Sequence, residues 1–176
     1  SEIRAVFEEW ENKTPGFTYK RKQDYWHTEG NFDFFGIMSA ERRAAWRFQF
    51  FTRAFAAGIR KVIIMDASLP EQVAVRAYIQ ALPNPFPMLP ATSQVKIIQG
   101  RVVAFRHPRE GKNGQVWIVW TQANRGDALI EIPVQKKQVE IVSVDGKKRL
   151  MVTPNNRLRV TLKGDAKMAP PLLILD

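Results

Sequence analysis

Two different patterns of hydrophobic residues divide the chain at about residue 92. In the first half, apolar residues recur at intervals of three and four, which is typical of amphipathic helices. Three segments have this spacing: residues 2–13, 39–57 and 69–82. Short apolar runs at Tyr25–Thr28 and Lys61–Met65 separate them. We therefore predict alternating helices and strands in residues 1–92.

The expected helix ends carry recognisable end signals. Ser39 is a suitable N-cap for the second helix, and Gly58 stands at its C-terminal end. Ser68 to Glu71 form a capping box that opens the third helix. The run Val62–Met65 is apolar without alternation, as in strands that are covered on both faces in parallel sheets.

The second half is predicted to be β-structure. The proline-rich segment Pro83–Pro90 is expected to be an extended connector. Beyond it, short strands are expected within residues 95–105, 116–120, 129–132, 138–144, 148–152, 158–162 and 170–175. Asp145-Gly146 is a strong hairpin signal between two of them. The expected fold class is α/β followed by an all-β region, an antiparallel β-sandwich at residues 93–176.

Composition restricts the possible classes of protein. The chain has 176 residues, of which 45% are hydrophobic and 25% charged, as in globular proteins. It contains no cysteine, which excludes disulfides and thiolate metal sites, and no cluster of metal ligands, so no metal or cofactor is expected. No apolar run is long enough to span a membrane, and no signal peptide is visible. Because the chain begins at Ser1 and not at Met, a signal could have been removed by processing or truncation.

The net charge of +10 raises the possibility of nucleic-acid binding. The basic residues are scattered, however, and their densest groups stand beside predicted turns and strand ends, where solvated lysines and arginines are common. No nucleic-acid-binding motif accompanies them. Nucleic-acid binding is therefore kept as a second alternative only.

Glu29 is the main candidate for a catalytic residue. It follows directly after the predicted strand Tyr25–Thr28, and α/β enzymes place their chemistry at the C-terminal ends of strands. His27 is two residues earlier and so shares a strand face with that position. Asn31 lies in the following loop, and Asp66 follows the second strand. Structural roles stay open for each of them: packing for His27, helix-start electrostatics for Asp66, and hydrogen bonding to loop amides for Glu29.

The element order, together with the motif Trp26-His27-Thr28-Glu29, resembles the C-terminal portion of TIM-barrel retaining glycoside hydrolases. In this resemblance residues 1–92 correspond to the last βα units of a (β/α)8 barrel. Residues 93–176 resemble the accessory β-domain beside such barrels. The similarity implies a partial barrel, a carbohydrate substrate and a secreted or periplasmic location.

The resemblance also implies roles for the candidate residues. Glu29 would be the catalytic nucleophile, and His27, Asn31 and Asp66 would contact substrate. The family's acid/base glutamate usually follows an asparagine, and this chain contains no Asn-Glu pair. Asp66 is weighed as a substitute. The resemblance otherwise implies that the acid/base lies outside this chain, in a missing N-terminal barrel portion or partner chain, and that the isolated chain is inactive.

A different class of function is also compatible with the sequence. Trp117 and Trp120 have opposite parity on one predicted strand, so at most one of them faces a sandwich core. The other is expected to contact the preceding helical region. In the alternative interpretation it belongs to the surface of a non-catalytic carbohydrate-binding or protein-interaction module.

Overall fold

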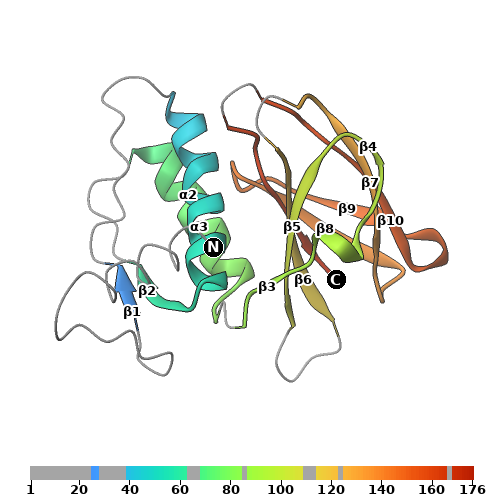
Figure 1. The fold of residues 1–176 in the computed structure, drawn as a ribbon, viewed down its shortest axis with the longest axis horizontal. Coiled ribbons are helices and arrows are strands. Elements are labelled where there is room, and N and C mark those ends of the chain that lie inside the picture. The colour runs from blue at the N-terminus through green and yellow to red at the C-terminus, as the bar shows by residue number, and fades with distance from the viewer. Residues whose placement is uncertain are drawn as a thin grey trace, which may run out of the picture.

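The computed structural model describes residues 25–27, 39–62, 68–84, 87–108, 114–122, 125–165 and 168–176, with only the backbone of 25–27. Two helices separate a small parallel sheet from a larger β-rich region (Figure 1). The predicted helix at residues 2–13 lies outside the described residues. The fold is a mixture of α and β structure with a β-rich C-terminal part, and the described residues contain no closed barrel.

The N-terminal part consists of β1 (Tyr25–His27), α2 (Ala40–Ala56), β2 (Ile59–Val62) and α3 (Leu69–Ala81). The β-rich part consists of β3 (Leu89–Pro90), β4 (Lys96–Gln99), β5 (Val102–Pro108), β6 (Gln115–Thr121), β7 (Ala128–Pro133), β8 (Gln138–Ser143), β9 (Lys148–Val152), β10 (Arg157–Leu162) and β11 (Leu172–Leu175). Short 3-10 turns stand at Thr92–Gln94 and Pro154–Asn156.

The two helices begin and end where their sequence signals predict. The hydroxyl of Ser39 accepts a hydrogen bond from the backbone N–H of Arg42, and Gly58 follows α2 with a φ of +95°. At the start of α3, Ser68 and Glu71 form a complete capping box. Leu82 ends this helix directly before Pro83, which cannot continue it.

The β-rich part contains two antiparallel sheets. The larger has the strand order β3-β5-β6-β11-β8-β9, and the smaller has the order β10-β7-β4. The turn between β8 and β9 is stabilised by hydrogen bonds from Gly146 N–H to the Ser143 carbonyl and from Ser143 N–H to the Lys147 carbonyl. Gly146 has a φ of +77°, so the Asp145-Gly146 hairpin signal is confirmed.

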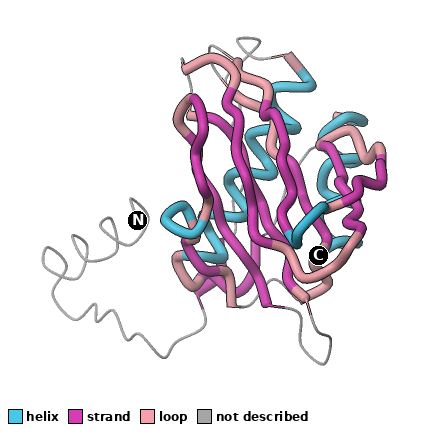
Figure 2. The backbone as a smooth tube through the Cα atoms, turned by 90° about the vertical axis from the view of Figure 1, so that its right-hand side faces the viewer, coloured by secondary structure: helices cyan, strands magenta, loops and turns pink. Residues whose placement is uncertain are grey.

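The central strands of the six-stranded sheet are buried on both faces. On β6, Val116, Ile118 and Trp120 belong to a core shared with the two helices. The alternate residues Trp117 and Val119 belong to a second core, which lies between the two sheets. Figure 2 is turned by 90° from Figure 1 and looks onto the β-rich part, with strands in front of the helices. This arrangement gives the central strands two hydrophobic faces, which explains why β6 is apolar almost throughout.

Several elements differ in extent from the sequence prediction. β2 begins at Ile59, two residues before the predicted Lys61, while residues 63–67 lie outside the described residues. The proline-rich segment is more than a connector, because Leu89 and Pro90 pair with Arg106 and Phe105 as an edge strand. An edge position suits Pro90, since proline cannot donate a hydrogen bond to a second neighbouring strand.

Candidate functional site

The parallel pair β1–β2 positions the candidate site. Tyr25 pairs with Ile59, Trp26 with Lys61 and His27 with Val62, with a register shift after Tyr25. Because the strands run in the same direction, their C-terminal ends meet at one edge, about 4.8 Å apart. His27 and Val62, the last described residues of these strands, are therefore neighbours, and Glu29 and Asp66 follow them in the sequence.

Most of the candidate residues themselves lie outside the described residues. Glu29, Asn31 and Asp66 belong to segments 28–38 and 63–67, and their predicted roles stay predictions. His27 is the last residue of β1, but only its backbone is described. The structure thus describes the strand ends that precede the candidate residues in the sequence.

Both helices begin on the side of the molecule where the parallel strands end. α2 connects β1 with β2, and it runs opposite to the strands, so that its N-terminus lies beyond their C-terminal ends (Figure 1). Its 17 residues span about 25 Å, far more than the four residues of β2. The first turns of α2 and α3 consequently flank the same end of the molecule as the candidate edge.

A buried ion cluster connects these two helix starts. Arg47 Nε donates to Glu71 Oε1 at 3.0 Å, and Arg43 Nε donates to Glu71 Oε2 at 3.2 Å. Ser68 donates to the same Oε2 from its hydroxyl at 2.6 Å and from its backbone N–H at 3.1 Å. Arg47 and Glu71 are 3% and 4% exposed. A cluster so enclosed fixes the relative position of α2 and α3.

The electrostatics of Glu71 identify it as a structural carboxylate. Burial alone would raise the pKa of Glu71, but the hydrogen bonds from Ser68, Arg43 and Arg47 together outweigh burial and leave the pKa below its ordinary value. A general acid for glycoside cleavage needs the opposite, a raised pKa. Glu71 is therefore held as an anion in this cluster. The capping-box pattern makes Glu71 recognisable in the sequence. Its partners Arg43 and Arg47 are four residues apart and so share one face of the helix, which is a sequence signal for them as well.

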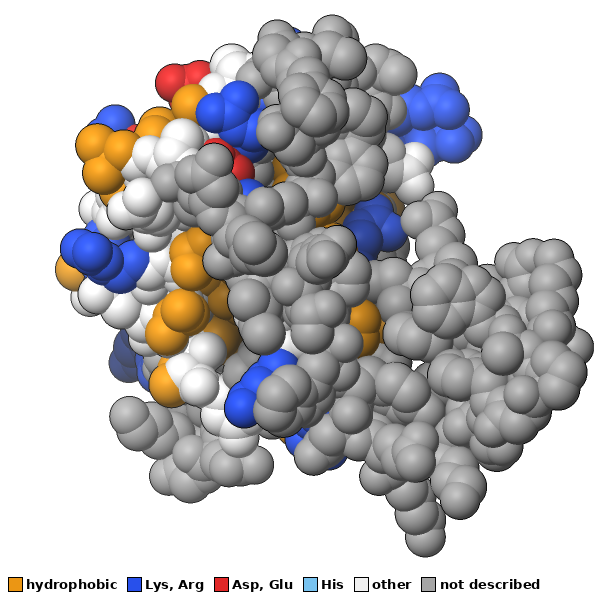
Figure 3. Space-filling model, turned by 90° about the vertical axis from the view of Figure 1, so that its left-hand side faces the viewer, with side chains coloured by type: hydrophobic (Ala, Val, Ile, Leu, Met, Phe, Trp, Pro, Cys, Tyr) orange, Lys and Arg blue, Asp and Glu red, His pale blue; other side chains and the backbone are white. Residues whose placement is uncertain are grey.

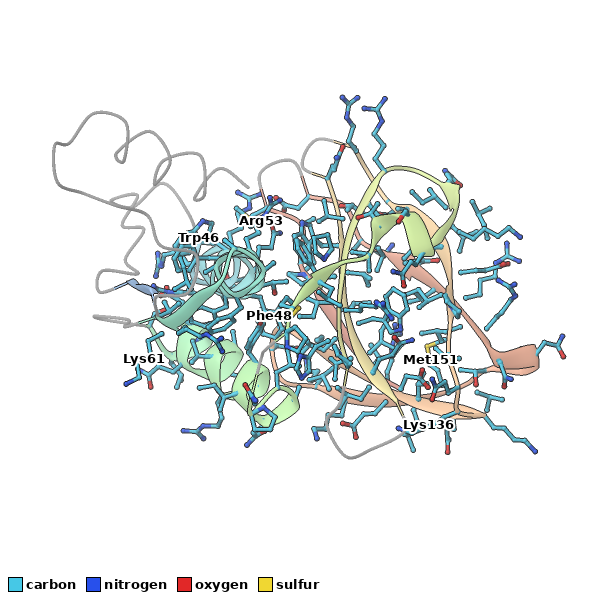
Figure 4. The ribbon with its side chains drawn as sticks, turned by 60° about the horizontal axis from the view of Figure 1, so that its bottom comes forward. Trp46, Phe48, Arg53, Lys61, Lys136 and Met151 are labelled. Atoms are coloured by element: carbon cyan, nitrogen blue, oxygen red, sulfur yellow. The ribbon has the colours of Figure 1, made fainter. Side chains whose placement is uncertain are left out.

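Aromatic side chains join the helices to the six-stranded sheet. Tyr78 of α3 makes edge contacts with Phe48 and Phe51 of α2, at centroid distances of 5.1 and 5.5 Å. On the sheet, Phe105 stacks on Trp120 at 5.6 Å, and the Arg53 guanidinium lies 5.5 Å from the Trp120 ring. Figure 4 shows Phe48 and Arg53 between α2 and the sheet, with Trp46 on the other side of the helix.

This interface decides the position of the two tryptophans of β6. Trp120 is 2% exposed and packs against the helical region, whereas Trp117 is fully buried between the sheets. The prediction that one of them contacts the helical region is confirmed. Neither ring is available to stack on a sugar, so the surface expected for a tryptophan-based carbohydrate-binding module is not formed by this pair.

Two adjoining grooves, not predicted from sequence, run along α3. One has a volume of about 570 Å³ and lies between the helix starts and the β8–β9 turn, with Leu69, Val73 and Val144 in its lining. The other has a volume of about 260 Å³ and lies between α3 and β8. On the side of the molecule that carries the helices, hydrophobic side chains are exposed beside lysines and arginines (Figure 3). Leu69 and Ile79 are 73% and 57% exposed.

His107 has a structural role. It lies within β5 and is 5% exposed, and its Nδ1 is 2.9 Å from the carbonyl oxygen of Pro87. In the part of the chain that is described, no group of three or more acidic or histidine side chains could hold a metal ion. No described helix is long and apolar enough to cross a membrane.

Comparisons with known proteins were made for the whole chain. No protein-family model matches this sequence, and no curated protein matches it either.

Proposed function

We propose that this chain forms the C-terminal part of a retaining glycoside hydrolase, in which Glu29 is the catalytic nucleophile. The observation that carries the proposal is the parallel pairing of His27 with Val62 across a helical connection. A strand–helix–strand unit with parallel strands is the repeating unit of a (β/α)8 barrel, whose active site stands at the C-terminal ends of the strands. Glu29 follows such an end by two residues.

A second observation supports the same assignment. α2 and α3 pack on one face of the six-stranded sheet, and α2 also contacts β2. Helices between a parallel sheet and a separate β-region are expected where an accessory β-domain packs on the outside of a barrel. The described residues contain one parallel pair, whereas a barrel needs eight parallel strands. The remaining strands would come from a preceding portion of the protein or from a partner chain.

In the proposed reaction the Glu29 carboxylate attacks the anomeric carbon of the sugar, and the bond to the leaving oxygen breaks. A second carboxyl group, about 5–5.5 Å away, gives its proton to that oxygen. The same group then removes a proton from water, which attacks the glycosyl ester and releases the sugar and the Glu29 carboxylate. His27, Asn31 and Asp66 contact the substrate, and the acid/base is supplied from outside this chain.

The test is the activity of the purified natural species that contains this chain, assayed with a panel of aryl glycosides. The expected result is hydrolysis with retained anomeric configuration, which falls by at least about three orders of magnitude in Glu29→Gln. Glu41→Gln is the matched control, because Glu41 is exposed on α2 and the substitution changes the same charge. Unchanged activity in Glu29→Gln would exclude Glu29 as the nucleophile.

A further inference from the structure

Basic residues gather around the outer strand of the six-stranded sheet. Residues 136–159, which include β8, β9 and the start of β10, contain seven lysines and arginines but two acidic residues, a net charge of +5. This short segment thus carries half of the chain's net charge of +10. Both acidic residues are already in ion pairs, Asp145 with Lys147 at 2.7 Å and Glu140 with Lys148 at 3.1 Å.

The other five basic residues of this segment are exposed cations. Within the part of the chain that the structure describes, no carboxylate forms an ion pair with them: Lys136, Lys137, Arg149, Arg157 and Arg159. A cluster of exposed cations without carboxylate partners attracts an acidic partner and repels a second copy of this chain.

The strand at the centre of this cluster has a free edge. β9 stands last in the strand order, and among the described residues it pairs only with β8. Its residues Leu150 and Val152 are 64% and 72% exposed. Proteins use lysine and arginine to protect such edges against pairing with copies of themselves, but the two apolar side chains are left uncovered here.

The ladder between β8 and β9 determines which backbone groups are free. Two backbone hydrogen bonds close it at its ends, from Ser143 N–H to the Lys147 carbonyl and from Thr153 N–H to the Lys137 carbonyl. Hydrogen-bonded and non-hydrogen-bonded pairs alternate in an antiparallel ladder, so Arg149 and Met151 direct their backbone groups toward β8. The N–H and C=O groups of Lys148, Leu150 and Val152 consequently point outward.

Charged and apolar positions have a definite order along this edge. The basic run Lys147–Arg149 stands at the start of β9, and the apolar Leu150 and Val152 follow it. At the other end, the hydrogen bond between Thr153 and Lys137 brings the Lys136-Lys137 pair beside the end of β9. A complementary strand therefore has acidic residues at both ends and apolar residues between them.

We propose that β9 binds an extended acidic segment of another protein, which joins the six-stranded sheet as a further strand. Its backbone pairs with the outward N–H and C=O groups of β9, its apolar side chains cover Leu150 and Val152, and its carboxylates meet the unpaired cations. This inference goes beyond the proposed function and does not depend on it. A preceding barrel portion would extend the parallel sheet, which the helices separate from the β-rich part (Figure 1).

Nucleic acid is the other kind of polyanion that these cations could attract. Single-stranded nucleic acid binds through its phosphates and through stacking of its bases on aromatic side chains. Residues 136–159 contain no aromatic residue, and Leu150 and Val152 place apolar surface between the charges. An added polypeptide strand satisfies the outward backbone groups and the apolar side chains together, which favours a protein partner.

The experiment is fluorescence anisotropy of the labelled peptide Glu-Asp-Val-Thr-Val-Thr-Val-Asp-Glu, titrated with the full chain. The peptide is expected to bind, and to bind more weakly as the salt concentration rises. Arg149→Glu reverses a charge on the edge and should raise the Kd about tenfold or more. Arg101→Glu is the matched control, because Arg101 is exposed and precedes β5, which is four strands from β9 in the sheet, and the Kd should stay nearly unchanged.

Amide hydrogen exchange measured by NMR tests the backbone pairing. On addition of the peptide the N–H groups of Leu150 and Val152 should become protected, whereas those of Arg149 and Met151, which already bond to β8, should change little. Leu150→Pro removes an outward donor and no bond to β8, so circular dichroism should show a folded chain. Its Kd for the peptide should rise about tenfold or more, because one backbone pair and a covered apolar side chain are lost.

Several results would overturn the proposal. If the folded chain does not bind the peptide, the basic residues only protect the edge. Unchanged affinity in Leu150→Pro, or equal effects of Arg149→Glu and Arg101→Glu, would show that no strand is added at β9. A single-stranded oligonucleotide that binds more tightly than the peptide and leaves the amides of Leu150 and Val152 unprotected would assign the surface to nucleic acid.

Discussion

The β-rich region and the N-terminal region differ in how their sheets are covered. The six-stranded sheet has helices on one face and the three-stranded sheet on the other. The parallel sheet has two short strands, which among the described residues pair only with each other. The large core beneath the helices is built on the antiparallel sheet, whereas helices in a barrel are expected to pack mainly on the parallel strands.

This difference indicates which of the two regions stabilises the other. Among the described residues, the core between the two sheets contains side chains of the β-rich region alone, including Trp117, Ile130 and Leu158. The core of α2 and α3 is completed by Phe105, Trp120 and Leu173 from the sheet. We therefore expect the β-rich region to stabilise the helices more than the helices stabilise it. The following predictions test that asymmetry.

The largest effects are expected at the two tryptophans of β6. Trp117→Ala and Trp120→Ala should each lower the free energy of unfolding by about 3–5 kcal/mol, because both rings are almost fully buried. The two variants should differ in where the loss appears. Trp117→Ala weakens the core that both regions need, while Trp120→Ala weakens only the attachment of the helices.

Hydrogen exchange measured by mass spectrometry distinguishes these outcomes. In Trp120→Ala the amides of α2 and α3 should exchange faster, with β7 and β10 still protected. In Trp117→Ala the protection of helices and sheets should fall together. Equal loss of protection in α2 and β7 in the Trp120→Ala variant would contradict the expectation that the β-rich region stabilises the helices more than they stabilise it.

The next effect concerns the cluster that holds the helix starts. Glu71→Gln removes the carboxylate that pairs with the buried Arg47 guanidinium at 3.0 Å, and breaking such a buried pair costs about 3–5 kcal/mol. Glu41→Gln, at an exposed position in the first turn of α2, should cost much less than Glu71→Gln. Urea denaturation of both variants measures the difference. A loss at Glu71 no larger than that at Glu41 would show that the cluster does not stabilise the fold.

The same cluster predicts a pH dependence with a definite sign. The pKa of Glu71 is lower in the folded protein than its ordinary value of 4.5. Its contribution to stability is therefore fully present above about pH 4.5, and it is lost as the pH falls through the lower folded value. The stability difference between wild type and Glu71→Gln should accordingly shrink below pH 4.5. A difference that stays constant down to pH 3 would contradict this assignment.

The smallest effect is expected where Arg53 meets Trp120. The guanidinium lies 5.5 Å from the ring centroid, and Arg53 is exposed, so the contact should contribute about 0.5–1 kcal/mol. Arg53→Met should lose this amount, and Arg53→Lys, which keeps a cation, should lose less. Thermal unfolding of the three proteins measures the order. Met and Lys variants of equal stability would show that the charge has no role there.

Much of the fold could be predicted because its signals are local. The N-caps Ser39 and Ser68, the Asp145-Gly146 turn and the alternation of β10 each act within a few residues. Trp117 and Trp120 are three residues apart on one strand and so point to opposite faces, which predicted that they pack in different places. These features depend on the chain's own geometry, so a single sequence contains them.

The remaining features depend on contacts between distant segments. The division of the strands into sheets of six and three was not predicted, and neither was the pairing of Leu89 and Pro90 with β5. The spacing of Arg43 and Arg47 placed both on one helix face, but it did not reveal that the buried Glu71 faces them. For the candidate site, the parallel neighbours β1 and β2 were predicted, and the roles of Glu29, Asn31 and Asp66 stay predictions.

The most direct test of the central claim is to trap the glycosyl-enzyme ester. The natural species that contains this chain is incubated with 2-deoxy-2-fluoro glycosides bearing good leaving groups, which slow hydrolysis of the ester, and is then digested and sequenced by mass spectrometry. Our account predicts a fluorosugar attached to the carboxylate of Glu29. An active species labelled on any other residue would contradict it.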